Sequence, residues 1–96
     1  MDVLFHVSTP EGARILLALA AACARARRSF ACFFTHDGVL ALRNAALLAA
    51  LAGATRAVAC EDSWQRFSAG LACPVELGSQ TTNSALVGEA GRVVSL

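Results

Sequence analysis

The sequence predicts one α/β domain, a three-layer α/β/α sandwich around a mostly parallel sheet of about five short strands. Short, nearly continuous apolar runs such as Val3–Val7 and Phe30–Phe34 are typical of strands buried on both faces. Helix signals lie between these runs, so strand and helix alternate along the chain. No linker, charge block or repeat divides the 96 residues, which predicts a single domain over 1–96.

Five strands are expected in chain order, at residues 3–7, 30–34, 57–60, 75–77 and 92–96. The first helix is expected to start at Ser8–Glu11, which offers a hydroxyl cap, a first-turn proline and an acid. Arg25, Arg27 and Arg28 complement the helix dipole at its other end.

Three more helices are expected, at about residues 39–52, 62–69 and 79–89. Asp37 is the predicted N-cap of the helix over 39–52, and Gly53 its C-cap. Gly70 is expected to stop the helix over 62–69.

The composition is unusually apolar for a small domain. Apolar residues make up 56% of the chain and charged residues only 16%, against about 25% charged in a typical domain. This excludes intrinsic disorder. One small core cannot absorb all of this apolar surface, so we expect a homo- or hetero-oligomer.

The apolar runs are too short to cross a membrane. Ile15–Ala24 and Ala45–Ala54 are each about half of the roughly 20 residues that a span needs. Met1–Val3 has no basic region ahead of an apolar stretch, so no signal peptide is visible. We therefore expect a cytoplasmic protein that does not associate with membranes.

Charge and cysteine usage exclude two further classes. A net charge of +1 is far from the basic footprint of a nucleic-acid binder, so no direct nucleic-acid partner is expected. The four cysteines form no CxxC pair and the two histidines are isolated, so no metal site is expected. Without a secretory signal, the cysteines are expected to be reduced thiols.

Cys60 is the most informative residue. It ends the third strand and directly precedes a helix N-terminus, where sheets of this type present side chains to solvent. Free amide donors and the positive helix end favour a thiolate there, and a lowered pKa makes a cysteine nucleophilic. Glu61 and Asp62 have opposing effects. Their carboxylates cap the helix, but their negative charges disfavour a thiolate on the neighbouring cysteine. The alternative is a buried structural cysteine.

For the other cysteines and both histidines, a structural role is the favoured interpretation. Cys23 and Cys32 are expected in the core, and Cys73, before Pro74, is the weaker functional candidate. His6 is read as a core or strand-end residue rather than a catalyst. His36 is read as a solvated turn residue, with a general base as the alternative.

Two further features, one polar and one aromatic, each allow a structural and a functional interpretation. Ser8 and Thr9 fit helix capping better than anion binding, because no glycine-rich loop accompanies them. Trp64 fits packing on the sheet and an interface anchor equally well.

With these motifs in place, the chain resembles the DsrE/TusD family of small sulfur-relay proteins along nearly its whole length. The resemblance rests on Phe33–Val39, an aromatic strand end followed by a polar turn and Gly-Val, and on the closing Arg92–Leu96. Cys60 falls where sulfur-carrying members place their active cysteine. The family fold is a three-layer α/β sandwich that assembles into trimers and hexamers, in which some subunits lack the cysteine and serve as scaffold.

The resemblance implies a persulfide carrier that uses Cys60 and needs no cofactor. Its partners would be sulfur-donor and sulfur-acceptor proteins, and its assembly a trimer or hexamer. One alternative is a non-catalytic assembly subunit. Another is a small anion- or nucleotide-binding α/β protein that uses the helix start at Ser8–Glu11.

Cys60 and Cys73 are not expected to form a disulfide within one chain. In a parallel arrangement Cys60 ends the third strand, whereas Cys73 enters the fourth strand at the opposite end of the sheet. A strand of four or five residues separates them by roughly 13–17 Å, while a disulfide needs Cα atoms within about 7 Å.

Overall fold

Five parallel strands form one sheet in the computed structural model, which describes residues 1–96. The strands are β1 (Val3–Val7), β2 (Phe30–Phe34), β3 (Arg56–Cys60), β4 (Glu76–Gly78) and β5 (Arg92–Ser95). Their order across the sheet is β4-β3-β2-β1-β5, and every neighbouring pair is parallel. The predicted α/β class with about five short strands is confirmed.

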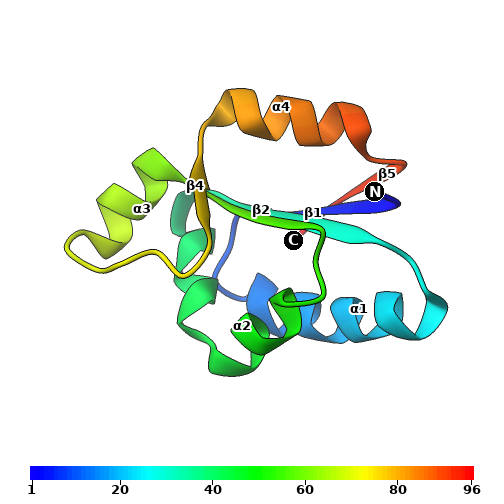
Figure 1. Cartoon of the computed structure of the whole chain (residues 1–96). Helices are drawn as coiled ribbons and strands as arrows, with labels where there is room; N and C mark the ends of the chain where they lie inside the picture. Colours follow the sequence, from blue (N-terminus) through cyan, green and yellow to red (C-terminus); the bar gives the residue numbers. More distant parts are fainter.

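Helices cover both faces of the sheet (Figure 1). The helical elements are α1 (Gly12–Ala26), the 3₁₀ helix η1 (His36–Arg43), α2 (Ala45–Leu51), α3 (Glu61–Ser68) and α4 (Gln80–Glu89). α1 and α2 lie on one face and α4 on the other, while α3 packs against η1 at one side. None of the helices has the length and apolar content needed to cross a membrane.

The two faces are covered very unequally. The chain steps from β1 to β4 in one direction, and α4 then carries it back across the sheet to β5. The ten residues of α4 span about 15 Å. This nearly equals the distance of about 19 Å between the two edge strands β4 and β5, which are four strand spacings apart. One helix therefore crosses the whole face. Leu86 is the only buried residue of α4.

The side chains of the strands divide between two cores. The larger core holds 16 buried residues on the α1 side, Cys32 and Phe34 of β2 among them. The smaller core lies on the α4 side and consists of six residues: Leu4, Ala31, Phe33, Val58, Cys60 and Leu86. Alternation along the strands thus points Cys60 toward the thinly covered face.

The first helix begins later than the sequence predicts. α1 starts at Gly12 with Glu11 as its N-cap, and no side chain caps it. Ser8 instead extends the sheet, because both its N–H and its hydroxyl donate to the Leu96 carbonyl. The expected capping role of Ser8 and Thr9 is therefore wrong. The Leu96 carbonyl at the end of β5 competes with the first amides of α1 for a hydrogen bond with the Ser8 hydroxyl.

The expected helix over 39–52 is two elements. η1 runs from His36 to Arg43, and α2 begins only at Ala45. Asn44 adopts an extended conformation between them, and its side chain accepts the Leu47 N–H at 3.0 Å. The N-cap is therefore Asn44 rather than Asp37, because a short amide side chain at this position satisfies the first free amides of α2.

The ends of the remaining helices follow the predictions more closely. Gly70, at φ +82°, lies just after α3, as expected of a helix stop. Gly53 does not act as the C-cap, since α2 ends at Leu51 with Ala52 as its C-cap, and Gly53 lacks the left-handed backbone of a glycine helix stop. Ser79 caps α4, and the predicted range 79–89 agrees with the observed helix.

Candidate functional site

Cys60 lies at the junction of β3 and α3. It is the last residue of β3 and the N-cap of α3, with an extended backbone. The expectation that it faces solvent is wrong, because only 6% of the residue is exposed. The start of α4 covers the sulfur from above, and Gln80 Nε2 lies 3.9 Å from Sγ. Cys60 is therefore a sheltered thiol with polar neighbours.

The pKa of Cys60 is lowered from its ordinary value of 9.0. Burial by itself raises this pKa, because a thiolate loses solvation. The Ser63 hydroxyl, the backbone N–H groups of Ser63 and Asp62, and the Thr35 hydroxyl lower it by more than that. These donors stabilise the charged form, so the site favours a thiolate in a place where burial alone would not.

Ser63 is oriented by the first residue of η1. The His36 N–H donates to Ser63 Oγ at 2.8 Å. Because that hydrogen bond occupies an acceptor position of the hydroxyl, the Ser63 O–H remains free to donate to the thiol. His36 has a left-handed backbone, with φ +52°, which is uncommon for a residue with a Cβ. The start of η1 thus places the His36 amide against α3.

A cavity of about 250 Å³ opens beside the sulfur. Eight residues line it: Thr35, His36, Cys60, Asp62, Ser63, Arg66, Phe67 and Gln80. Six of these side chains are polar or charged, and Arg66 lies over the Phe67 ring at 5.3 Å. A thiolate that opens into a polar cavity can attack a reactant that enters from outside.

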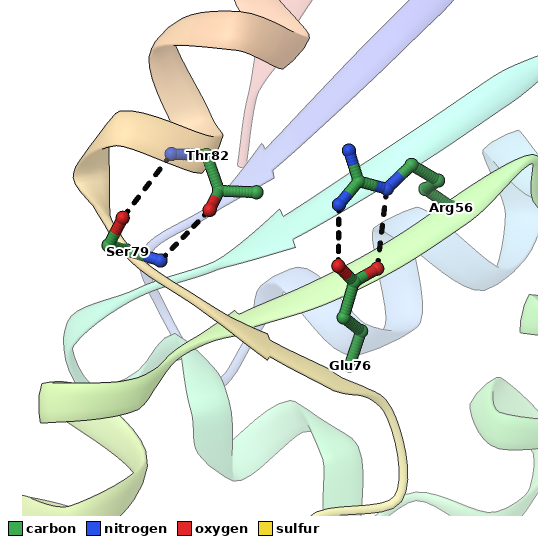
Figure 2. A network of polar contacts seen from close by, with 4 residues as sticks. All are labelled: Arg56, Glu76, Ser79 and Thr82. Carbon is green, nitrogen blue, oxygen red and sulfur yellow. Dashed lines mark hydrogen bonds and ion pairs between the residues drawn. The ribbon is translucent and has the colours of Figure 1, made fainter.

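Two pairs of polar contacts hold β4 and the first turn of α4 in place (Figure 2). Arg56 of β3 and Glu76 of β4 form a two-bond ion pair, with N···O distances of 3.3 and 2.5 Å. Ser79 and Thr82 bond each other's backbone N–H, forming a capping box. These contacts fix the entry of α4 and therefore the position of Gln80.

The other three cysteines lie away from this cavity. Cys23 and Cys32 are buried in the larger core, as predicted. Burial, and then the neighbouring Cys23, raises the pKa of Cys32 to about 12. Burial also raises the pKa of Cys73, which is half-buried. All four thiols are free. β3 and β4 are parallel, as the argument against a disulfide between Cys60 and Cys73 assumed.

The remaining predicted residues take structural positions. His6 is half-buried with its ring stacked on Phe33, and burial lowers its pKa. Trp64 is buried in the larger core and donates its Nε1–H to the Leu71 carbonyl at 2.9 Å. His36 is exposed, as predicted, but it begins η1 rather than lying in a turn, and its place beside Cys60 was not expected.

Five residues of the cavity were not singled out individually in the sequence: Thr35, Ser63, Arg66, Phe67 and Gln80. Thr35 and Gln80 do have a signal, since each follows a strand whose end meets the end of β3 in a parallel sheet. Ser63 lies in the first turn of the helix that Cys60 caps, which is a second signal. No group of three or more His, Cys, Asp or Glu side chains could hold a metal ion.

A scan against protein-family models, a search of curated proteins and a search of solved structures each found no match.

Proposed function

We propose that the protein is a sulfur-relay protein that carries sulfane sulfur as a persulfide on Cys60. The observation that carries the proposal is the lowered pKa of a sheltered thiol that opens into a polar cavity. A persulfide carrier needs a nucleophilic thiolate, and it must also protect the sulfur that it holds. Cys60 combines the two properties.

The transfer step is a thiol–persulfide exchange. The Cys60 thiolate attacks the outer sulfur of a donor persulfide, R–S–SH. The bond between Cys60 Sγ and that sulfur forms as the donor's S–S bond breaks, and the donor leaves as the thiolate R–S⁻. The proton stays on the transferred sulfur, giving Cys60–S–SH. The Cys60 sulfur is oxidised and the donor sulfur is reduced, so no other reactant is needed.

The residues around Cys60 suit both steps of such a relay, the uptake of sulfur from a donor and its release to an acceptor. The hydroxyls of Thr35 and Ser63 stabilise the attacking thiolate, and later the same thiolate as the leaving group when sulfur passes on. Gln80 and Arg66 line the cavity and provide side-chain N–H donors for the outer sulfur. The donor and acceptor are proposed to be proteins whose own thiols approach this cavity.

Sulfur loading tests the proposal. The protein is incubated with a low-molecular-weight persulfide, and each transferred sulfur adds about 32 Da to the residue that carries it. Peptide mapping by mass spectrometry should locate the addition on Cys60. The matched control is Cys73→Ser, since Cys73 is the other cysteine outside the deep core and its pKa is shifted upward.

Cys73→Ser should load as the parent does, whereas Cys60→Ser should not. Equal loading of the Cys60→Ser variant would rule out Cys60 as the carrier. A parent protein that resists loading while it is folded would favour the alternative of a non-catalytic assembly subunit.

A further inference from the structure

The two edges of the sheet differ in how they are protected against pairing. β4 is only three residues long, follows Pro74 closely and carries Glu76, which is held by Arg56. Short strands, prolines and charges are the usual means by which proteins block an edge. β5 is the other edge, and Val93 and Ser95 on it are exposed. β5 is therefore the open edge.

The backbone groups of β5 that lack a partner can be assigned from its bonds to β1. Leu96 donates its N–H to His6 and accepts the Ser8 N–H, so both of its backbone groups point toward β1. Bonding direction alternates along a strand. The N–H and C=O groups of Val93 and Ser95 therefore point outward, away from the sheet.

An apolar groove adjoins this edge on the α1 side. It has a volume of about 310 Å³ and lies between α1 and the strands β1 and β5, with Leu19, Phe5 and Val94 in its lining. Ile15, one turn before Leu19 on the same helix face, is 50% exposed. The groove and the open edge together form one unpartnered surface.

The ends of this surface carry opposite charges. Arg28 and Arg92 lie together at one end of the groove, where Asp2 offsets one of their two positive charges. At the other end, Glu11 precedes Gly12, which packs close to Leu96 at the end of β5. A two-fold rotation about the middle of β5 would bring each pair of arginines next to the acid of the other copy. The surface is thus complementary in charge to itself.

We infer that β5 pairs with β5 of a second copy of this chain in antiparallel orientation, with the two-fold axis at Val94. In this register Val93 lies opposite the partner's Ser95, and the four outward groups of each strand are all hydrogen-bonded. Val94 faces the partner's Val94 across the axis, and the two apolar grooves meet beneath them. The result is a continuous ten-stranded sheet.

The dimer leaves both Cys60 sites free. Seven strand spacings of about 4.8 Å separate β3 from β3 of the partner, or roughly 34 Å along the sheet. The inference therefore does not rest on the proposed function, and either can fail without the other.

Sedimentation equilibrium of the full chain tests the pairing. At concentrations from about 1 to 100 μM, the mass should rise toward twice 9.9 kDa, or toward another even multiple. Ser95→Pro removes one outward N–H from each copy without touching a bond to β1, so it should weaken dimerisation at least about tenfold while the circular dichroism spectrum is kept. A strict monomer, an odd-numbered oligomer, or a dimer that Ser95→Pro leaves unchanged would overturn the inference.

Disulfide trapping tests the register. Residues that face each other in a non-hydrogen-bonded antiparallel pair have Cα atoms about 4.5 Å apart, which is within the range of a disulfide. Val94→Cys should therefore cross-link on oxidation in a background where Cys60 and Cys73 are replaced by Ser, and Cys23, which lines the same groove as Val94, by Ala. The control is Leu77→Cys on the β4 edge, which is 45% exposed in the parent. Equal cross-linking of the two variants, or none in Val94→Cys, would contradict the register.

Charge reversal tests the orientation. Glu11→Arg and Arg92→Glu should each weaken dimerisation, and the double variant should recover most of the loss, since the two charges are only exchanged. Failure of the double variant to recover would show that these residues do not meet across the axis.

Discussion

Cys32 and Cys60 lie on neighbouring strands of one sheet, and their thiols are shifted in opposite directions. Cys32 is in the middle of β2, faces the larger core and has a pKa raised to about 12. Cys60 ends β3, is also buried, and has a lowered pKa. Burial is common to both, so it does not decide their chemistry. The decisive difference is the set of hydrogen-bond donors at the end of a strand.

The largest expected effect is on thiol reactivity in the native protein. A pKa of about 12 leaves about one Cys32 thiol in 10⁵ ionised at pH 7, whereas a pKa below 9.0 ionises more than about one Cys60 thiol in 100. Iodoacetamide should therefore modify Cys60 at least about 1000 times faster than Cys32. Rates are measured by mass spectrometry, and the two thiols should react alike once the chain is unfolded. Comparable alkylation rates for Cys32 and Cys60 in the native protein would contradict the opposite pKa shifts of the two thiols.

A smaller effect is expected when the donors around Cys60 are removed. Ionisation of Cys60 makes it reactive, so its alkylation rate should rise with pH around a midpoint below 9.0. Ser63→Ala and Thr35→Val remove donors that favour the charged form, so each should move the midpoint upward. We expect about a tenfold slower reaction at pH 7 for Ser63→Ala.

Ser68→Ala is the matched control for Ser63→Ala on the same helix. The Ser68 hydroxyl is buried without a hydrogen-bond partner. Its removal should leave the Cys60 midpoint unchanged. A midpoint that moves equally in both variants would point to a general disturbance of α3 rather than a specific donor.

The smallest effect is expected at the ion pair between β3 and β4. Arg56 and Glu76 are both substantially exposed, at 38% and 49% of their side chains. Arg56→Met should lower the free energy of unfolding by less than about 1 kcal/mol. It should change Cys60 alkylation by no more than about twofold and leave Cys32 unaffected, because the main donors come from α3 and Thr35. Urea unfolding and the same alkylation assay measure these changes. A large loss of Cys60 reactivity would show that the contacts around Gln80 govern the thiol.

Sequence reasoning predicts the fold well because the apolar runs of this chain are short and distinct. The fully buried run Phe30–Phe34 could only be a central strand, and it is one. The break between η1 and α2 was not predicted, since the segment over 39–52 is apolar with only one arginine and one asparagine. The extended conformation of Asn44 reflects local packing that a periodicity pattern does not contain.

The candidate site was predicted only at its centre. Cys60 was singled out from its position between a strand and a helix, but its burial was not foreseen, because the cover comes from α4, 20 residues later. The contact between His36 and Ser63 depends on a left-handed residue and joins segments 27 positions apart. Neither property can be read from neighbours in the sequence.

The thin cover over the Cys60 face has a consequence for how the molecule unfolds in parts. Leu86 is the only buried residue of α4, whereas α1 has five buried residues and places four of them in the larger core. Segments with few buried apolar contacts open at a lower free energy than the rest of a domain. α4 is therefore the element whose backbone amides should exchange with solvent first. Each such opening uncovers Cys60 and Phe33 further while the larger core stays closed, so a local equilibrium adds to the access that the cavity already gives to the sulfur.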